Sequence, residues 1–132
     1  MALGLSGGEI GAARCWTLEQ VEHFGWGAGW RPDSGTVALV VSELVTNALR
    51  HAGGGRVGVC LVLEVGRLRI AVSDESRHEP VIQPPGPGRV GGHGLRIVAS
   101  VAARWGVRPH GTGKEVWADL LPQHPTLASA SD

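Results

Sequence analysis

The longest regular run of apolar positions in the chain extends from Thr36 to Ala52. Its apolar residues recur at helical spacing and define one stripe: Val37, Val41, Leu44, Ala48 and Leu49. Asp33 or Ser34 supplies an N-cap, and three consecutive glycines from Gly53 supply a stop. The run is too long for a strand, so the pattern predicts a long amphipathic helix whose apolar stripe faces a core.

Two further segments have helical periodicity, one before and one after this helix in the chain. From about Glu9 to Phe24 the apolar residues are spaced as in a helix, and a glycine- and tryptophan-rich stretch then ends the pattern. The period returns at His93, with apolar residues at Leu95, Val98, Ala99, Ala102 and Ala103. We therefore expect helices in both segments.

Four segments have the pattern of strands. Val57–Val65 is rich in β-branched residues, and Arg67–Ser73 alternates between apolar and polar positions. In Arg67–Ser73, one face carries Leu68, Ile70 and Val72, and the other carries Arg67, Arg69 and Ala71. A tight turn at Gly66 would join these two strands into a hairpin. Trp105–Arg108 and Glu115–Leu121 are expected to be the last strands, with residues 109–113 as the loop between them.

The remaining segments are expected to be loops or ends. Residues 75–92 hold four of the eight prolines and four glycines, and so long a loop in a compact domain is usually functional, often a lid. Residues 1–8 are expected to fray and residues 122–132 to be a loose tail. The expected order is helix, helix, strand, strand, helix, strand, strand. This order predicts one domain over residues 9–121: an α+β, two-layer sandwich with helices on one face of a mostly antiparallel sheet.

Composition narrows the functional class. The chain has 132 residues, 42% hydrophobic and 18% charged, which is typical of one globular domain. Twelve basic and twelve acidic residues balance, which argues against nucleic acid as the main partner. No apolar run is long enough for a membrane helix, and the N-terminus lacks the features of a signal peptide. Two cysteines, Cys15 and Cys60, are too few for a disulfide framework and favour a reducing cytoplasm.

Glu43 and Asn47 form the first candidate constellation. They lie four residues apart on the Thr36–Ala52 helix and so share one face. Asn47 is the only asparagine of the chain, and its amide oxygen is suited to ligate Mg²⁺. A carboxylate in the position of Glu43 can orient a nucleophile or take its proton. A solvated polar stripe explains the same spacing, and spacing alone favours that simpler interpretation.

Asp74 and the glycine cluster at residues 91–94 are further candidate ligand-binding positions. Asp74 ends the alternating strand, where a carboxylate facing a cleft can accept a hydrogen bond from the amino group of a nucleobase; a turn-starting Asp is the simpler alternative. The glycine cluster at residues 91–94 precedes a helix, where backbone N–H groups can approach phosphate; a flexible hinge is the alternative. Three other kinds of site lack their patterns: the phosphate-binding loop that ends in Gly-Lys-Ser/Thr, a zinc site and a serine-hydrolase elbow.

In combination, these motifs closely resemble the GHKL ATPase superfamily, which includes gyrase B and the histidine kinases. The resemblance covers about residues 9–121 and comes closest to the small serine/threonine kinases that act as anti-sigma factors in actinobacteria. The motifs that carry it are Glu43-Leu44-Val45-Thr46-Asn47-Ala48 with His51-Ala52, Asp74, the Pro/Gly-rich segment 75–92, Gly92-His93-Gly94-Leu95, and Gly113-Lys114-Glu115-Val116-Trp117-Ala118.

The resemblance implies a Bergerat ATP-binding fold and a role for each matching residue. Glu43 matches the general base, Asn47 the Mg²⁺ ligand, and Asp74 the acid that reads the adenine amino group. Gly92 and Gly94 match glycines that close over the phosphates, and residues 75–92 match the ATP lid. Other matching positions are expected to contact the nucleotide: His51, Ser76, His93, Leu95 and Lys114. The implied cofactors are ATP or ADP and Mg²⁺.

The chain departs from the family pattern at three places. The adenine loop usually reads Asp-x-Gly-x-Gly, whereas here Ser76 and His78 replace the glycines. Lys114 follows Gly113 where the family often has Thr. The first strand, which builds the dimer sheet of the anti-sigma kinases, is not evident in the N-terminal segment.

The resemblance implies an ATP/Mg²⁺-dependent serine/threonine kinase in the cytoplasm. It would bind a sigma factor and phosphorylate a small anti-anti-sigma partner. The resemblance is compatible with a homodimer. No direct contact with nucleic acid or with a membrane is expected. Two alternatives stay open. One is a nucleotide-binding regulatory module without phosphotransfer. The other is a histidine-kinase-type catalytic domain that acts in trans on a histidine of another protein.

Overall fold

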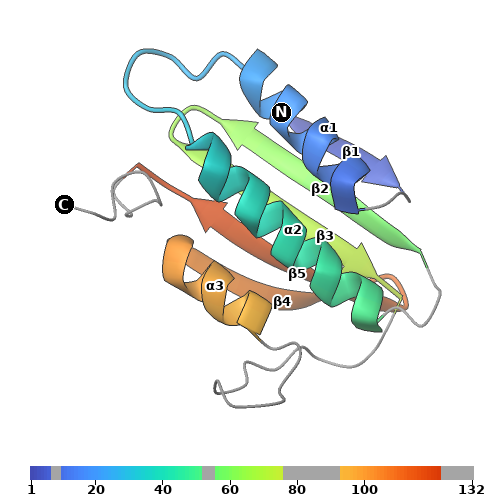
Figure 1. Cartoon of the computed structure of the whole chain (residues 1–132). Helices are drawn as coiled ribbons and strands as arrows, with labels where there is room; N and C mark the ends of the chain where they lie inside the picture. The colour runs from blue at the N-terminus through green and yellow to red at the C-terminus, as the bar shows by residue number, and fades with distance from the viewer. Residues whose placement is uncertain (7–9, 52–55, 76–92, 123–132) are drawn as a thin grey trace.

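The computed structural model describes residues 1–6, 10–51, 56–75 and 93–122 of the chain (Figure 1). Within these ranges, eight elements follow one another: β1 (Ala2–Ser6), α1 (Ile10–His23), α2 (Ser34–His51), β2 (Val57–Glu64), β3 (Arg67–Asp74), α3 (His93–Val101), β4 (Arg104–His110) and β5 (Gly113–Leu120). The segment 76–92, expected to be a lid, and the tail from residue 123 lie outside the described residues.

The described elements form two layers. The strands make one sheet in the order β1-β2-β3-β5-β4, and every neighbouring pair is antiparallel. The three helices lie side by side on one face of this sheet, with α2 in the middle (Figure 1). The predicted α+β two-layer sandwich is thereby confirmed.

The core lies between the layers and follows the alternation of the central strands. In β3, Leu68, Ile70 and Val72 are fully buried, as the pattern predicts. They pack against the apolar stripe of α2, in which Val37, Val41, Leu44 and Ala48 are buried. Leu49, assigned to the same stripe, is 42% exposed, because it lies in the last turn of α2 at the margin of the helix layer.

Two local signals act as expected. The backbone N–H of Thr36 donates to Oδ2 of Asp33 at 2.9 Å, so Asp33 caps the start of α2. The β2–β3 hairpin turns at Gly66, whose φ of 87° lies in the left-handed region that glycine adopts without strain. This turn fixes the register of the hairpin, in which Val57 pairs with Asp74.

The N-terminus corrects the prediction. Residues 1–8 were expected to fray, with no first strand, but Ala2–Ser6 form β1 and pair along β2 from Ala2–Val62 to Ser6–Gly58. The order therefore begins with a strand before the two helices. Leu3 and Leu5 pack against the core, so tertiary contacts stabilise a segment whose glycine and serine content disfavours a strand.

The last hairpin and α3 also differ in their bounds. β4 extends to His110 and β5 starts at Gly113, so the predicted five-residue loop is a two-residue turn at Gly111 and Thr112. α3 ends at Val101, short of the apolar positions that extended its pattern to Ala103.

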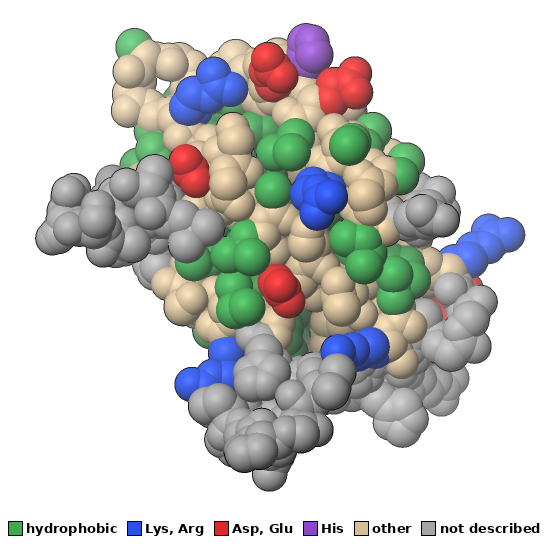
Figure 2. Space-filling view, viewed as in Figure 1, with side chains coloured by type: hydrophobic (Ala, Val, Ile, Leu, Met, Phe, Trp, Pro, Cys, Tyr) green, Lys and Arg blue, Asp and Glu red, His purple; other side chains and the backbone are tan. Residues whose placement is uncertain are grey.

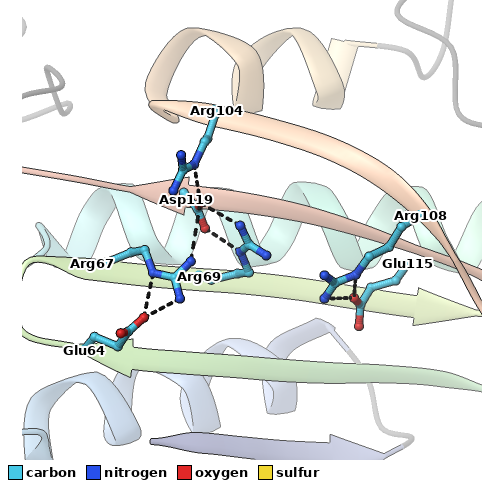
Figure 3. A network of polar contacts seen from close by, with 7 residues as sticks. All are labelled: Glu64, Arg67, Arg69, Arg104, Arg108, Glu115 and Asp119. Carbon is cyan, nitrogen blue, oxygen red and sulfur yellow. Dashed lines mark hydrogen bonds and ion pairs between the residues drawn. The ribbon is translucent and has the colours of Figure 1, made fainter.

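The uncovered face of the sheet carries a network of ion pairs (Figure 3). Asp119 on β5 is fully buried beneath it and accepts hydrogen bonds from Arg69 Nε at 2.7 Å and Arg104 Nε at 2.6 Å. The guanidinium of Arg69 also lies over the ring of Trp117, 4.2 Å from its centroid. Long arginine side chains thus cover the face opposite to the three described helices.

Candidate functional site

Glu43 lies in the middle of α2, and its carboxylate reaches the first turn of α3. A Cβ added at Gly94 would come within 2.6 Å of Oε2 of Glu43. The absence of a side chain at Gly94 therefore makes room for this carboxylate. The two residues are 51 positions apart in the sequence, and the packing of α3 on α2 brings them together (Figure 1).

Asn47 lies one helical turn after Glu43 and is half-buried. Its Nδ2 atom is buried and has no hydrogen-bond partner within the described part of the chain. A buried amide without a partner costs free energy. The described fold thus leaves this amide nitrogen unsatisfied, which suits a residue that meets a ligand.

Asp74 is the last residue of β3 and faces the helix layer, in line with Leu68, Ile70 and Val72. Across the sheet it stands directly opposite Lys114, the second residue of β5. Lys114 Nζ donates to Asp74 Oδ1 at 3.1 Å, and the two side chains are only 5% and 1% exposed. The carboxylate expected to read a nucleobase is therefore already paired with the only lysine of the chain.

The start of β5 fits very closely against the end of β3. A Cβ added at Gly113 would lie 1.9 Å from the carbonyl oxygen of Asp74 and 2.6 Å from Cα of Glu75. Only glycine fits at this position, because both obstacles are backbone atoms. This contact fixes the backbone that carries Lys114.

Two hollows adjoin this pair. One, of about 380 Å³, is lined by residues of the β4–β5 hairpin that include Val107, Pro109 and Lys114. The other, of about 240 Å³, is lined by residues that include Asp74, Glu75 and Gly113. A cavity of 300 Å³ or more has the size of typical small-ligand sites. The larger hollow thus offers room for a planar base next to Lys114.

The candidate residues gather at one end of the sandwich. α2 ends at His51, and β2 begins nearby with Val57, which pairs with Asp74. The C-terminal end of α2 and the end of β3 therefore lie at the same end of the sheet (Figure 1).

The other predicted site residues either lie outside the described part of the chain or belong to the core. Ser76 and Gly92 lie outside the described residues, as do the side chains of His51 and His93, which are the last residue of α2 and the first of α3. Leu95 is 2% exposed and belongs to the core, so packing accounts for it in the described structure. Its contact with nucleotide stays a prediction.

Alternative chemistries find little support in the described residues. They contain no group of three or more His, Cys, Asp or Glu that could hold a metal ion. Cys15 and Cys60 are free thiols. Burial, assisted by the charge of Glu115, raises the pKa of the Cys60 thiol, which disfavours its reactive thiolate form. A zinc site or a cysteine nucleophile is therefore not supported within this part of the chain.

The surface of the helix layer is mixed in charge. Arginine side chains are scattered singly among acidic ones over the described part of this face (Figure 2). A nucleic-acid-binding surface usually carries a clustered basic stripe. Among the described residues, no helix is long and apolar enough to span a membrane.

Sequence reasoning missed the ion pair between Asp74 and Lys114. It listed both residues as nucleotide contacts, but it did not bring them together. Two signals were available: Lys114 is the only lysine among twelve basic residues, and it lies where the family often has Thr. The strand register that places the two residues opposite each other could not be predicted from either signal.

Known proteins share this fold and part of this sequence. A curated relative, blue-light-activated histidine kinase 2 of Erythrobacter litoralis, is 34% identical over 102 residues, which cover 71% of this chain. The chain spans only 30% of the length of that protein. The solved histidine kinase domain of the blue-light-activated kinase of Erythrobacter litoralis EL346 aligns with a TM-score of 0.52 and 27% identity, covering 85% of this chain and 60% of the solved chain.

A second solved structure, of the blue-light-activated kinase EL346 of Erythrobacter litoralis, aligns with a TM-score of 0.51 and 23% identity, covering 85% of this chain and 40% of the other; it supports the fold. The family model described as the histidine kinase-like ATPase domain matches residues 11–120. This match covers most of the chain and confirms the GHKL resemblance, and an ATPase domain implies a site for ATP. The chain thus belongs to the histidine kinase-like ATPase domain family.

Proposed function

We propose that this chain is an ATP- and Mg²⁺-dependent serine/threonine kinase of the anti-sigma type. It would bind a sigma factor and phosphorylate a small anti-anti-sigma protein, both in the cytoplasm. The observation that carries the proposal is the placement of the Glu43 carboxylate beside Gly94 at the start of α3, one helical turn from Asn47.

The residues at this site fit Mg²⁺ and a nucleotide. Asn47 has a buried amide that no described residue satisfies, and an amide oxygen is a ligand that Mg²⁺ accepts. The metal ion, when bound, neutralises charge on the phosphates. The start of α3 presents backbone N–H groups suited to phosphate oxygens. Asp74 supplies an acceptor for the amino group of adenine.

Glu43 is suited to be the general base. A serine or threonine hydroxyl must lose its proton as it attacks the terminal phosphorus of ATP, and a carboxylate within reach can take it. The other described site residues would position the substrates and stabilise charge on the transferring phosphoryl group. This need for a base favours a hydroxyl acceptor, because a neutral imidazole attacks through a lone pair that carries no proton.

A second candidate function is phosphotransfer to histidine, favoured by the relatives, which are histidine kinases. The target histidine would then lie on another protein. A nucleotide-binding module without phosphotransfer is the third candidate.

A homodimer is part of the proposal. β1 is the outermost strand at its end of the sheet order, and an edge strand can pair with another chain. We expect a mass of twice 13.8 kDa by light scattering. A monomeric mass would remove the dimer from the proposal and leave the catalytic assignment unchanged.

The decisive experiment is transfer of labelled phosphate. The chain is incubated with ATP labelled on its terminal phosphate, Mg²⁺ and one candidate anti-anti-sigma protein at a time. We expect label on the partner that survives acid, as phosphoserine and phosphothreonine do. Acid-labile label would favour histidine as acceptor. Binding of Mg·ATP without any transfer would favour the regulatory module.

A further inference from the structure

The buried pair of Asp74 and Lys114 lies at the position where a nucleobase is expected. The two residues are directly opposed in the β3–β5 register, and their side chains are almost completely buried. Their counterpart on the far face of the same two strands is the pair of Arg69 and Asp119, also directly opposed. Of these two pairs, only Asp74 and Lys114 face the helix layer, and Lys114 lines the larger hollow beside it.

The position of Lys114 is set by the backbone. Because Gly113 has no side chain, β5 can lie close to the carbonyl oxygen of Asp74, and the β3–β5 register holds Lys114 opposite Asp74. Lys114 therefore emerges from a fixed point, and only its flexible side chain can move. Because the side chain also lines the larger hollow, it has space to swing there when its partner is taken.

The ammonium group and a base amino group compete for the same acceptor. Both are hydrogen-bond donors on the side that meets Asp74, and a carboxylate only accepts. A buried ammonium that loses its carboxylate is left as an uncompensated charge. Lys114 holds Oδ1 of Asp74, so an amino-bearing base that approaches this oxygen has to displace or weaken the contact with Lys114.

We propose that Lys114 is a specificity-determining residue that competes with the nucleobase amino group for Asp74 and so weakens the binding of adenine nucleotides. This inference rests on the proposed nucleotide site. In the free chain the ammonium group of Lys114 is bound to the Asp74 carboxylate. The amino group of an adenine base takes its place there by exchange with Lys114.

The test compares Lys114→Met with its parent in calorimetric titrations with ADP and with inosine diphosphate, which lacks the amino group. Methionine keeps the length of the side chain and removes its charge. We expect Lys114→Met to bind ADP about tenfold more tightly than the parent, since a hydrogen bond to a charged group is no longer exchanged. Affinity for inosine diphosphate should change by much less.

Arg69→Met is the matched control. It removes one arginine from the opposed pair on the far face of the same strands, and its affinity for ADP should equal that of the parent. If Lys114→Met does not fold, Lys114→Thr replaces it, because threonine suits a strand and its short uncharged side chain removes the ammonium group from Asp74. The same gain for ADP is expected.

The outcomes separate this inference from the proposed function. If the parent binds ADP and the Lys114 variant binds it equally or more weakly, Lys114 helps to hold the base and the inference is overturned. An equal gain for both nucleotides also overturns it, because the amino group would then be irrelevant. If neither the parent nor the variant binds ADP, the proposed function itself is wrong.

Discussion

Gly94 and Glu43 are in direct van der Waals proximity, and any side chain at position 94 would collide with the carboxylate. The obstacle to a Cβ there is Oε2 of Glu43, 2.6 Å away, and the next atoms of Glu43 lie at 3.6 Å. Oε2 is the far end of a flexible side chain, so it can move aside without disturbing the backbone. The glycine thus leaves the space that the carboxylate of the proposed base occupies.

Gly94→Ala should therefore separate stability from activity. The helix gains an alanine while the carboxylate of Glu43 is displaced, so the free energy of unfolding should change by no more than about 1 kcal/mol. Phosphotransfer should fall at least about tenfold, because the base is misplaced. Gly11→Ala is the control: Gly11 lies in α1 with nothing within 4 Å of an added Cβ, and its rate should match the parent. An unchanged rate in Gly94→Ala would contradict the role of Glu43.

Substitutions at Glu43 and at Asn47 should affect different properties of the protein, namely phosphotransfer and Mg²⁺-dependent nucleotide binding. Glu43→Gln keeps the shape of the side chain and removes the base, so Mg·ATP should still bind while transfer falls by about 10²–10⁴. Asn47→Ala should lose the Mg²⁺ dependence of nucleotide binding as well. Calorimetric titrations with and without Mg²⁺, run beside the transfer assay, measure both effects. If both variants behave like the parent, the two residues are only a solvated polar stripe.

Asp74→Asn tests the base-reading acid. The change removes a charge-assisted hydrogen bond, so ADP affinity should fall by about 1–3 kcal/mol. It also weakens the ion pair with Lys114, so thermal unfolding is measured in parallel to separate loss of fold from loss of binding. Glu64→Gln, which changes an exposed carboxylate on the same hairpin, serves as the control. Equal ADP affinity in Asp74→Asn and the parent would remove Asp74 from the site.

The sequence predicts the central elements of this fold because their patterns are local. The apolar stripe of α2 and the alternation in β3 each lie within one segment, and both are present in the structure. β1 could not be predicted in this way. Ala2–Ser6 has little intrinsic preference for a strand, and it is a strand because β2 offers an edge for pairing.

The contacts within the candidate site could not be predicted from local sequence patterns either. Helical spacing places Glu43 and Asn47 on one face, but nothing in the spacing brings Gly94 to Glu43 or Lys114 to Asp74. The first contact depends on how α3 packs on α2, and the second depends on the register of β5 against β3. Motif resemblance identified these residues individually, whereas their contacts depend on the tertiary fold.

Asp119 is expected to be a major source of stability, although it lies away from the site. It is fully buried and holds Arg69 and Arg104 on the uncovered face of the sheet (Figure 3). Burial by itself would raise the pKa of Asp119, but the hydrogen bonds from these two arginines outweigh that effect and hold the pKa below its ordinary value. The carboxylate thus stays ionised in the folded chain at a pH where it would be protonated in the unfolded chain.

Asp119→Asn should lower the free energy of unfolding at pH 7 by about 3 kcal/mol, the lower end of the cost of breaking a buried ion pair. A lowered pKa stabilises the fold above the unfolded value, about 3.9, and that contribution is lost as the pH falls through the folded value. The difference between parent and variant should thus be constant from about pH 5 to 7 and shrink below about pH 4. Urea unfolding at a series of pH values measures it.

Glu64→Gln, which removes the half-exposed partner of Arg67, should cost within about 0.5 kcal/mol throughout. A difference for Asp119→Asn that is absent at pH 7, or that persists unchanged into acid, would show that its charge does not stabilise the sheet.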